Sequence, residues 1–189
     1  HRALTGSPDE KVMYCTGEEF TNEIVDAIRN KTTNLFKKKY RALGLLMVDD
    51  IQFISGKVAV QEEFFHTFNA VLSARGQIVL TSDVPPTDIP RLESRLRSRF
   101  EAGLIIDIAP PDFELRAAIT LIKAKEKNIN LSMSAAQTIA ANIDSPRKIK
   151  GFLARLISES RSLGKEITDD LVNTLLNKTN GDIKPNRVI

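Results

Sequence analysis

The sequence predicts an α/β fold, a parallel sheet with flanking helices, followed by a small all-helical lid. Short apolar runs alternate with amphipathic segments as far as Pro110-Pro111, and this alternation is typical of strands joined by right-handed helical crossovers. The proline pair then breaks the pattern, and the rest is helical to about Asn177. The predicted domains are an α/β nucleotide-binding part at 1–111, a helical lid at 112–179 and a linker toward a DNA-binding domain at 180–189.

Four apolar runs are predicted strands: "KVMYCT" (11–16), "LGLLMVDD" (43–50), "GQIVLTSD" (76–83) and "GLIIDIAP" (103–110). Most of them are almost continuously apolar, which is typical of parallel strands covered on both faces. Two helical segments lie between them. Segment 17–40 presents the apolar face Phe20, Ile24, Val25 and Ile28, and segment 61–75 presents Phe64, Phe65, Phe68, Val71 and Leu72.

Four helices are predicted after the proline pair. They cover 112–127, 134–143, a segment from Ser145-Pro146 to about Gly164, and a segment that opens at Thr168. Serine before proline is a common helix start, and glycine is a common helix end.

Composition narrows the class of protein. The net charge of +3 permits an acidic partner such as nucleic acid but does not require one. A single cysteine, Cys15, excludes a disulfide within the chain. No apolar stretch approaches the roughly 18 residues of a membrane span, and the N-terminus lacks the pattern of a signal peptide. A cytoplasmic location is therefore predicted.

Two adjacent carboxylates, Asp49 and Asp50, follow the apolar run that ends at Val48. In doubly wound sheets, ligands bind beyond the carboxyl ends of the strands. Such paired acids have the form of a Walker B element, in which one carboxylate holds Mg²⁺ and its neighbour orients the attacking water. A solvated turn between strand and helix is the alternative interpretation. Thr81, Ser82 and Asp83 end another strand at the same rim, where they would contact phosphate or water, or form a turn.

Arginines provide a second signal. Arg91, Arg95 and Arg99 recur every four residues, which predicts a basic row on one helix. Such a row is either a solvated face or the source of an arginine finger for a neighbouring subunit's nucleotide. Arg147 lies in the first turn of a lid helix, where the helix dipole does not favour a cation. It is either a surface residue or a contact for an anion.

Taken together, "LLMVDDIQF", "QEEFFHTFN", "TSDVPP" and "RLRSRF" resemble the AAA+ domain of the bacterial replication-initiator (DnaA) family, and the resemblance covers nearly the whole chain. It implies an AAA+ P-loop-type sheet with a helical lid, and ATP or ADP with Mg²⁺ as cofactors. It also implies head-to-tail assembly into a filament on single- and double-stranded origin DNA and opening of the duplex. The replicative helicase and regulators are further implied partners.

The same resemblance implies roles for individual residues. Those around the nucleotide are Asp49 for magnesium, Asp50 for hydrolysis, Asp83 as sensor 1, Arg99 as arginine finger, Arg95 as a second assembly arginine and Arg147 as sensor 2. The helix with Val25 and the insertion with Lys57 correspond to the element that grips single-stranded DNA. In that insertion, Ala59 and Val60 stand where the family often has a basic residue.

One departure from the family is large. No G-x-x-x-x-G-K-[ST] motif occurs, so the phosphate-cradling loop is absent from the sequence. We expect the chain to be part of a longer protein with slow, switch-like ATPase activity, and to be inactive as it stands. Two alternatives remain: a related regulatory adaptor or helicase loader, and a catalytically dead scaffold. A helix-turn-helix domain after Ile189 would favour the initiator, whereas a chain ending there would favour the adaptor or loader.

Overall fold

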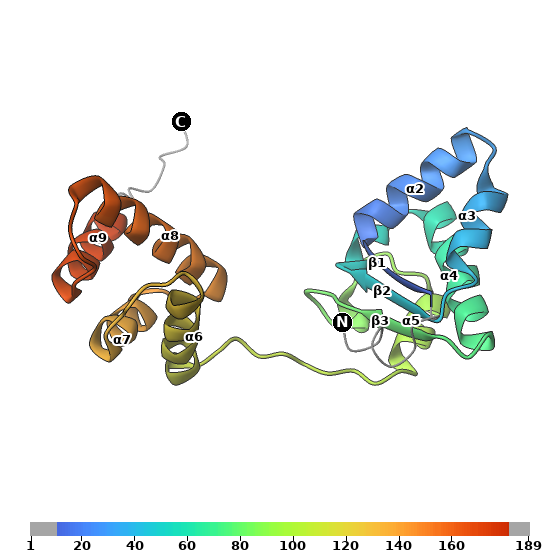
Figure 1. The fold of residues 1–189 in the computed structure, drawn as a ribbon. Coiled ribbons are helices and arrows are strands. Elements are labelled where there is room, and N and C mark those ends of the chain that lie inside the picture. The colour runs from blue at the N-terminus through green and yellow to red at the C-terminus, as the bar shows by residue number, and fades with distance from the viewer. Residues whose placement is uncertain (1–10, 182–189) are drawn as a thin grey trace, which may run out of the picture. The chain divides into compact units, whose positions relative to one another are not determined.

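The computed structural model describes residues 11–181, which divide into two compact units between Ile106 and Asp107 (Figure 1). The first unit holds a parallel sheet of three strands in the order β1-β2-β3: β1 (Val12–Thr16), β2 (Leu45–Asp49) and β3 (Gln77–Leu80). The central strand β2 pairs Val48 with Cys15 on one side and with Leu80 on the other. The predicted α/β class and the first three predicted strands are confirmed.

The prediction of a fourth strand at 103–110 is wrong. Residues 103–110 have no strand conformation, and Leu104 and Ile108 are each 88% exposed. A strand is stable only where a neighbouring strand satisfies its backbone N–H and C=O groups. Within the described residues no strand pairs with this segment, so its apolar side chains do not suffice to form one.

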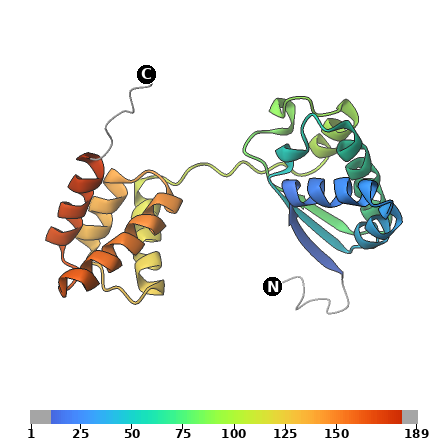
Figure 2. The ribbon, with the colours of Figure 1, turned by 90° about the horizontal axis from the view of Figure 1, so that it is seen from above.

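Among the residues that the structure describes, helices cover mainly one face of the sheet. Side chains alternate along a strand, so Leu46 and Val48 lie on the face covered by helices and are buried. On the opposite face Tyr14 is 60% and Val79 is 50% exposed. The expectation of cover on both faces is therefore wrong here, and Figure 2 shows α2 (Gly17–Arg29) lying along one side of the sheet.

The segment predicted as one helix over 17–40 forms two, α2 and α3 (Thr33–Tyr40). Lys31, in left-handed conformation with φ 57°, separates them. Thr16 begins α2 with a capping box in which Glu19 N–H donates to Thr16 Oγ1 and Thr16 N–H donates to the Glu19 carboxylate. Of the predicted apolar face, Phe20 and Ile24 are buried, whereas Val25 and Ile28 are 38% and 49% exposed.

Aromatic side chains hold the helices of the first unit together. Phe20 packs edge-on against Phe36, Tyr40 and Phe64, with ring centroids 5.1–5.3 Å apart. These contacts join α2, α3 and α4 (Val58–Ser73). Of the apolar face predicted for 61–75, Phe64, Phe68 and Val71 are buried, Phe65 is half-buried and Leu72 is exposed. The remaining elements of the unit are the 3-10 turns η1 (Ile51–Ile54) and η2 (Pro86–Asp88) and the helix α5 (Ser94–Glu101).

The described part of the second unit contains helices without strands. They are α6 (Phe113–Glu126), α7 (Met133–Asn142), α8 (Pro146–Leu163) and α9 (Asp169–Gly181), which confirm the four predicted helices. Pro146 is the first residue of α8, and Gly164 ends it in left-handed conformation with φ 62°. Ile139, Ile149 and Leu153 are fully buried in the shared core.

The functional domains predicted from the sequence stay predictions. Helix α9 includes Asn180 and Gly181, and the rest of the predicted linker, 182–189, lies outside the described residues. None of the helices in the described residues has both the length and the apolar character needed to span a bilayer.

Candidate functional site

The candidate site lies at the carboxyl end of β2, in a bend that the packing fixes closely. Asp49 is the last residue of this strand, and Asp50 follows it in left-handed conformation with φ 55° and ψ 53°. This conformation is strained for most residues, although aspartate tolerates it better than others. A Cβ at Gly17 would lie 2.6 Å from the carbonyl oxygen of Asp50, so only glycine fits where α2 begins.

The carboxylate of Asp49 is oriented by the two strands that flank β2. Tyr14 Oη of β1 donates a hydrogen bond of 3.0 Å to Oδ2, and Thr81 Oγ1, one residue after β3, donates to Oδ1. The bond to the Asp49 carboxylate raises the pKa of the Tyr14 phenol, because it favours the protonated donor. Both carboxylate oxygens therefore have fixed directions.

Thr81 and Gln52 join the three aspartates into one cluster. The backbone N–H of Asp50 donates to Thr81 Oγ1 at 3.0 Å, so this hydroxyl links Asp49 and Asp50. Gln52 Nε2 donates to Asp50 Oδ1 at 3.2 Å and makes a longer contact of 3.4 Å with Asp83 Oδ2. We call Asp49, Asp50, Thr81 and Asp83 the acidic rim.

Sequence reasoning missed two members of this network, Tyr14 and Gln52. The contact of Tyr14 could have been predicted from the sequence, because strand alternation places this residue on the same face as Asp49 once β1 and β2 are paired in register. Gln52 carried no signal, since it lies in a 3-10 turn whose course the sequence does not indicate.

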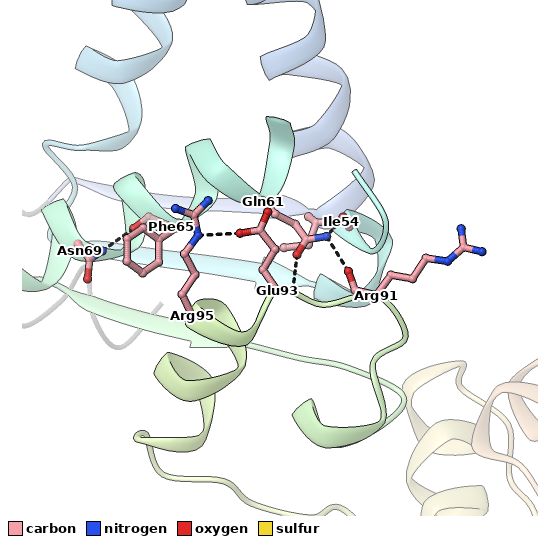
Figure 3. Close-up of polar contacts among 7 residues, drawn as sticks. All are labelled: Ile54, Gln61, Phe65, Asn69, Arg91, Glu93 and Arg95. Carbon is pink, nitrogen blue, oxygen red and sulfur yellow. Dashed lines mark hydrogen bonds and ion pairs between the residues drawn. The ribbon is translucent and has the colours of Figure 1, made fainter. Parts of the chain in front are cut away.

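The prediction that Arg91, Arg95 and Arg99 form a row on one helix is only partly correct. Arg95 and Arg99 lie on α5, but Arg91 precedes the helix in left-handed conformation with φ 52°, so the prediction that it shares their helix face is wrong. Arg95 Nε contacts Glu93 Oε2 at 2.6 Å, and its guanidinium lies 4.8 Å from the centre of the Phe65 ring (Figure 3). The side chain of Arg99 is exposed and makes no hydrogen bond or ion pair with the described residues.

The other predicted site residues are not among the four residues of the acidic rim. Val25 is partly exposed on α2, and Lys57 precedes α4 with its ammonium donating to the carbonyl of Phe53 at 2.7 Å. Arg147 is exposed in the first turn of α8, in the second unit. The roles assigned to all these residues stay predictions.

The rim fits a magnesium ion that is shared with a phosphate ligand. In the described part of the chain no three His, Cys, Asp or Glu side chains lie close enough to hold a metal by themselves. Mg²⁺ in nucleotide sites commonly takes one or two carboxylates and completes its shell with water and phosphate oxygens. Asp49 and Asp50 supply such a partial set.

Residues 1–107 match the family model described as the bacterial DnaA ATPase domain. The chain is also similar to the crystal structure of domain III of the Thermotoga maritima replication initiation protein DnaA, with 34% sequence identity and a TM-score of 0.87. That alignment covers 93% of this chain and 74% of the other.

Two ligand-bound structures are similar as well. One is the replication initiator DnaA bound to AMPPCP and single-stranded DNA, with 32% identity and a TM-score of 0.76 over 82% of this chain and 48% of that one. The other is AMPPCP-bound DnaA from Aquifex aeolicus, with 33% identity and a TM-score of 0.74 over 80% of this chain and 47% of that one. The chain thus spans about half the length of these two proteins.

Proposed function

Because the chain belongs to the family of the bacterial DnaA ATPase domain, we propose that it is part of an ATP-controlled initiator of chromosomal replication. The observation that carries the proposal is the acidic rim, in which Thr81 and Gln52 join carboxylates from two strand ends. This is the edge of a parallel sheet at which ligands bind. The similarity to AMPPCP-bound relatives supports a nucleotide as the ligand.

In this proposal the rim contacts the triphosphate and its magnesium ion. Asp49 holds the ion through the carboxylate that Tyr14 and Thr81 orient. The ion, when bound, would neutralise charge on the phosphates. Asp50 orients the water that attacks the terminal phosphate, and Asp83 contacts that phosphate or the same water. The residues that cradle the phosphates would come from the P-loop that this sequence lacks.

The arginines supply the opposite charge. Arg99 reaches the nucleotide of the next subunit, where an arginine stabilises the charge that develops during hydrolysis. Arg147 in the helical unit responds to the nucleotide of its own subunit, and Arg95 supports the assembly. Because each nucleotide would then contact two subunits, ATP promotes head-to-tail assembly into a filament on origin DNA.

The DNA contacts are proposed for the surface that bears Val25 and Lys57. The similarity to a relative bound to AMPPCP and single-stranded DNA supports single-stranded DNA as a ligand. A filament that holds one strand would promote opening of the duplex, in the cytoplasm and with the replicative helicase and regulators as later partners.

The test uses the complete gene product, ATP with Mg²⁺, and DNA that carries the replication origin. We expect ATP-dependent assembly on this DNA, and we expect Arg99→Ala to retain ATP binding but lose assembly. Arg161→Ala, which removes another exposed arginine in the last turn of α8, is the matched control and should assemble normally. Failure of the unaltered protein to bind ATP would refute the proposal, and normal assembly of Arg99→Ala would refute the role of Arg99.

A further inference from the structure

One polar side chain of the first unit, Gln61 in the first turn of α4, is almost completely buried, with 1% exposed. Its amide Nε2 donates to the carbonyl oxygens of Ile54, at 3.2 Å, and Arg91, at 3.0 Å. Its Oε1 accepts from the backbone N–H of Glu93 at 2.8 Å (Figure 3). Both amide hydrogens and the carbonyl oxygen are thus used, and every partner is a backbone group outside α4.

These three bonds join the acidic rim to the arginine helix. Ile54 ends the turn η1, which begins directly after Asp50. Glu93 is the N-cap residue of α5, the helix that carries Arg99. The Gln61 amide therefore holds the segment after the rim and the start of the arginine helix in one fixed arrangement.

Helix α5 depends on such anchors. It has eight residues, and helices of this length are not stable in isolation. The Glu93 side chain does not cap the helix, because it binds Arg95, and that arginine in turn lies against Phe65 of α4. Leu96 and Phe100 bury the inner side of the helix, and Gln61 holds its N-cap residue.

We propose that Gln61 is a positioning residue for the arginine helix, and that it sets the direction in which α5 presents Arg99. This inference rests on the proposed function, in which Arg99 acts on the nucleotide of a neighbouring subunit. An arginine finger works only when its guanidinium meets the transferred phosphate closely, and a displacement of about 1 Å can lower a rate by about a hundredfold. Loss of the Gln61 amide would also leave the partly buried N–H of Glu93 and two carbonyl groups without this partner.

The first experiment compares two amide losses on the same helix in the complete gene product. Gln61→Met keeps the length of the side chain and removes its hydrogen bonds. Asn69→Leu is the matched control, because within residues 11–181 the Asn69 amide donates only to the carbonyl of Phe65 in its own helix, at 3.0 Å. With ATP, Mg²⁺ and origin DNA, we expect Gln61→Met to bind ATP within about twofold of the unaltered protein and to hydrolyse it at least about tenfold more slowly. Asn69→Leu should behave as the unaltered protein.

A mixing experiment separates positioning from general damage to the fold. Asp50→Asn protein has an impaired rim but an intact arginine helix, whereas Gln61→Met keeps every side chain of the rim. In a random equimolar mixed assembly the Asp50→Asn subunits should supply Arg99 to the nucleotides of Gln61→Met subunits. About one site in four then combines an intact rim with a correctly presented Arg99, so hydrolysis should recover several-fold, to about a quarter of the unaltered rate. A mixture of Gln61→Met with Arg99→Ala should show no recovery, because neither partner presents the arginine correctly.

Each outcome has one meaning. Recovery only with Asp50→Asn supports the positioning role. Normal hydrolysis by Gln61→Met alone, or a defect that no partner restores, overturns this role while leaving the proposed function in place. Absence of ATP binding and DNA-dependent hydrolysis in the unaltered protein overturns the proposed function and the positioning role with it.

Discussion

The acidic rim of the first unit and the helical core of the second are stabilised by different forces. At the rim, Thr81 and Asp83 are exposed and Asp49 is half-buried, and hydrogen bonds fix their positions. In the second unit, Ile149 and Leu153 are completely buried among other apolar side chains. Burial of apolar surface is the dominant stabilising contribution in proteins, whereas one exposed hydrogen bond adds little.

This difference distinguishes residues that stabilise the fold from residues that hold the side chains of the rim in a fixed arrangement. Asp50 has a strained backbone conformation, and Gly17 approaches it so closely that no other residue fits, yet the rim buries little apolar surface. Strain that brings no gain in stability is typical of binding and catalytic sites. We therefore expect substitutions in the helical core to affect mainly stability, and substitutions at the rim to affect mainly ligand binding.

The largest loss of stability is expected for Leu153→Ala in the second unit. The side chain is fully buried, and removing three carbon atoms from such a core costs about 2–5 kcal/mol in the free energy of unfolding. Leu163→Ala in the same helix is the control, because Leu163 is 51% exposed and should cost less than about 1 kcal/mol. Urea unfolding followed by circular dichroism measures both. Equal losses would contradict the packing of α8 described above.

Gly17→Ala tests how tightly the bend after β2 is packed. The new Cβ would lie 2.6 Å from a backbone oxygen, and overpacking of this kind costs about 1–3 kcal/mol. Gly151→Ala is the matched control, because a Cβ there meets no atom within 4 Å and alanine favours the interior of α8 by about 0.5–1 kcal/mol. The two substitutions should shift the melting temperature in opposite directions. A neutral Gly17→Ala would show that the bend can relax.

The sequence predicted those elements of the fold that local patterns determine. The helix α8 was bounded correctly by Ser145-Pro146 and Gly164, because both ends use common capping residues. The break at Lys31 was missed, since the polar residues around it fit an exposed helix face as well as a loop. The apolar content of segment 103–110 predicts a strand, but strand formation also requires a partner far away in sequence.

The site was predictable to a similar extent. The meeting of Asp49, Asp50 and Asp83 follows from the rule that parallel strands end at the same edge. The contacts of Gln61 were not predictable, because its partners are backbone groups whose positions depend on the complete tertiary structure. The position of Arg91 outside the helix of Arg95 and Arg99 was not predictable for the same reason. Its left-handed conformation depends on the tertiary structure of the loop and not on its neighbours in sequence.

Thr81→Val is expected to lose less stability than Leu153→Ala and to weaken ATP binding. Valine keeps the shape of threonine but removes the hydroxyl that joins Asp49 to the backbone of Asp50, at a cost of about 1 kcal/mol in stability. In the complete gene product, Mg²⁺-dependent ATP binding should weaken by about tenfold, since about 1.4 kcal/mol corresponds to that factor. Thr81→Ser retains the hydroxyl and should restore binding. Weak binding by the serine variant would indicate that the methyl group, not the hydroxyl, matters.

The smallest expected effect is a change in the pKa of Tyr14. It probes the rim at a single side chain. Its hydrogen bond to Asp49 raises the pKa of the phenol above the ordinary value of 10.0, so the bond persists below that pH and is lost as the pH rises through the raised pKa. In Asp49→Asn protein the Tyr14 pKa should fall toward 10.0, as measured from the ring resonances by NMR. Tyr40, whose pKa is raised by burial and by Glu23, is the internal control and should not respond. An unchanged Tyr14 pKa would mean that another group, not the carboxylate of Asp49, orients this side of the rim.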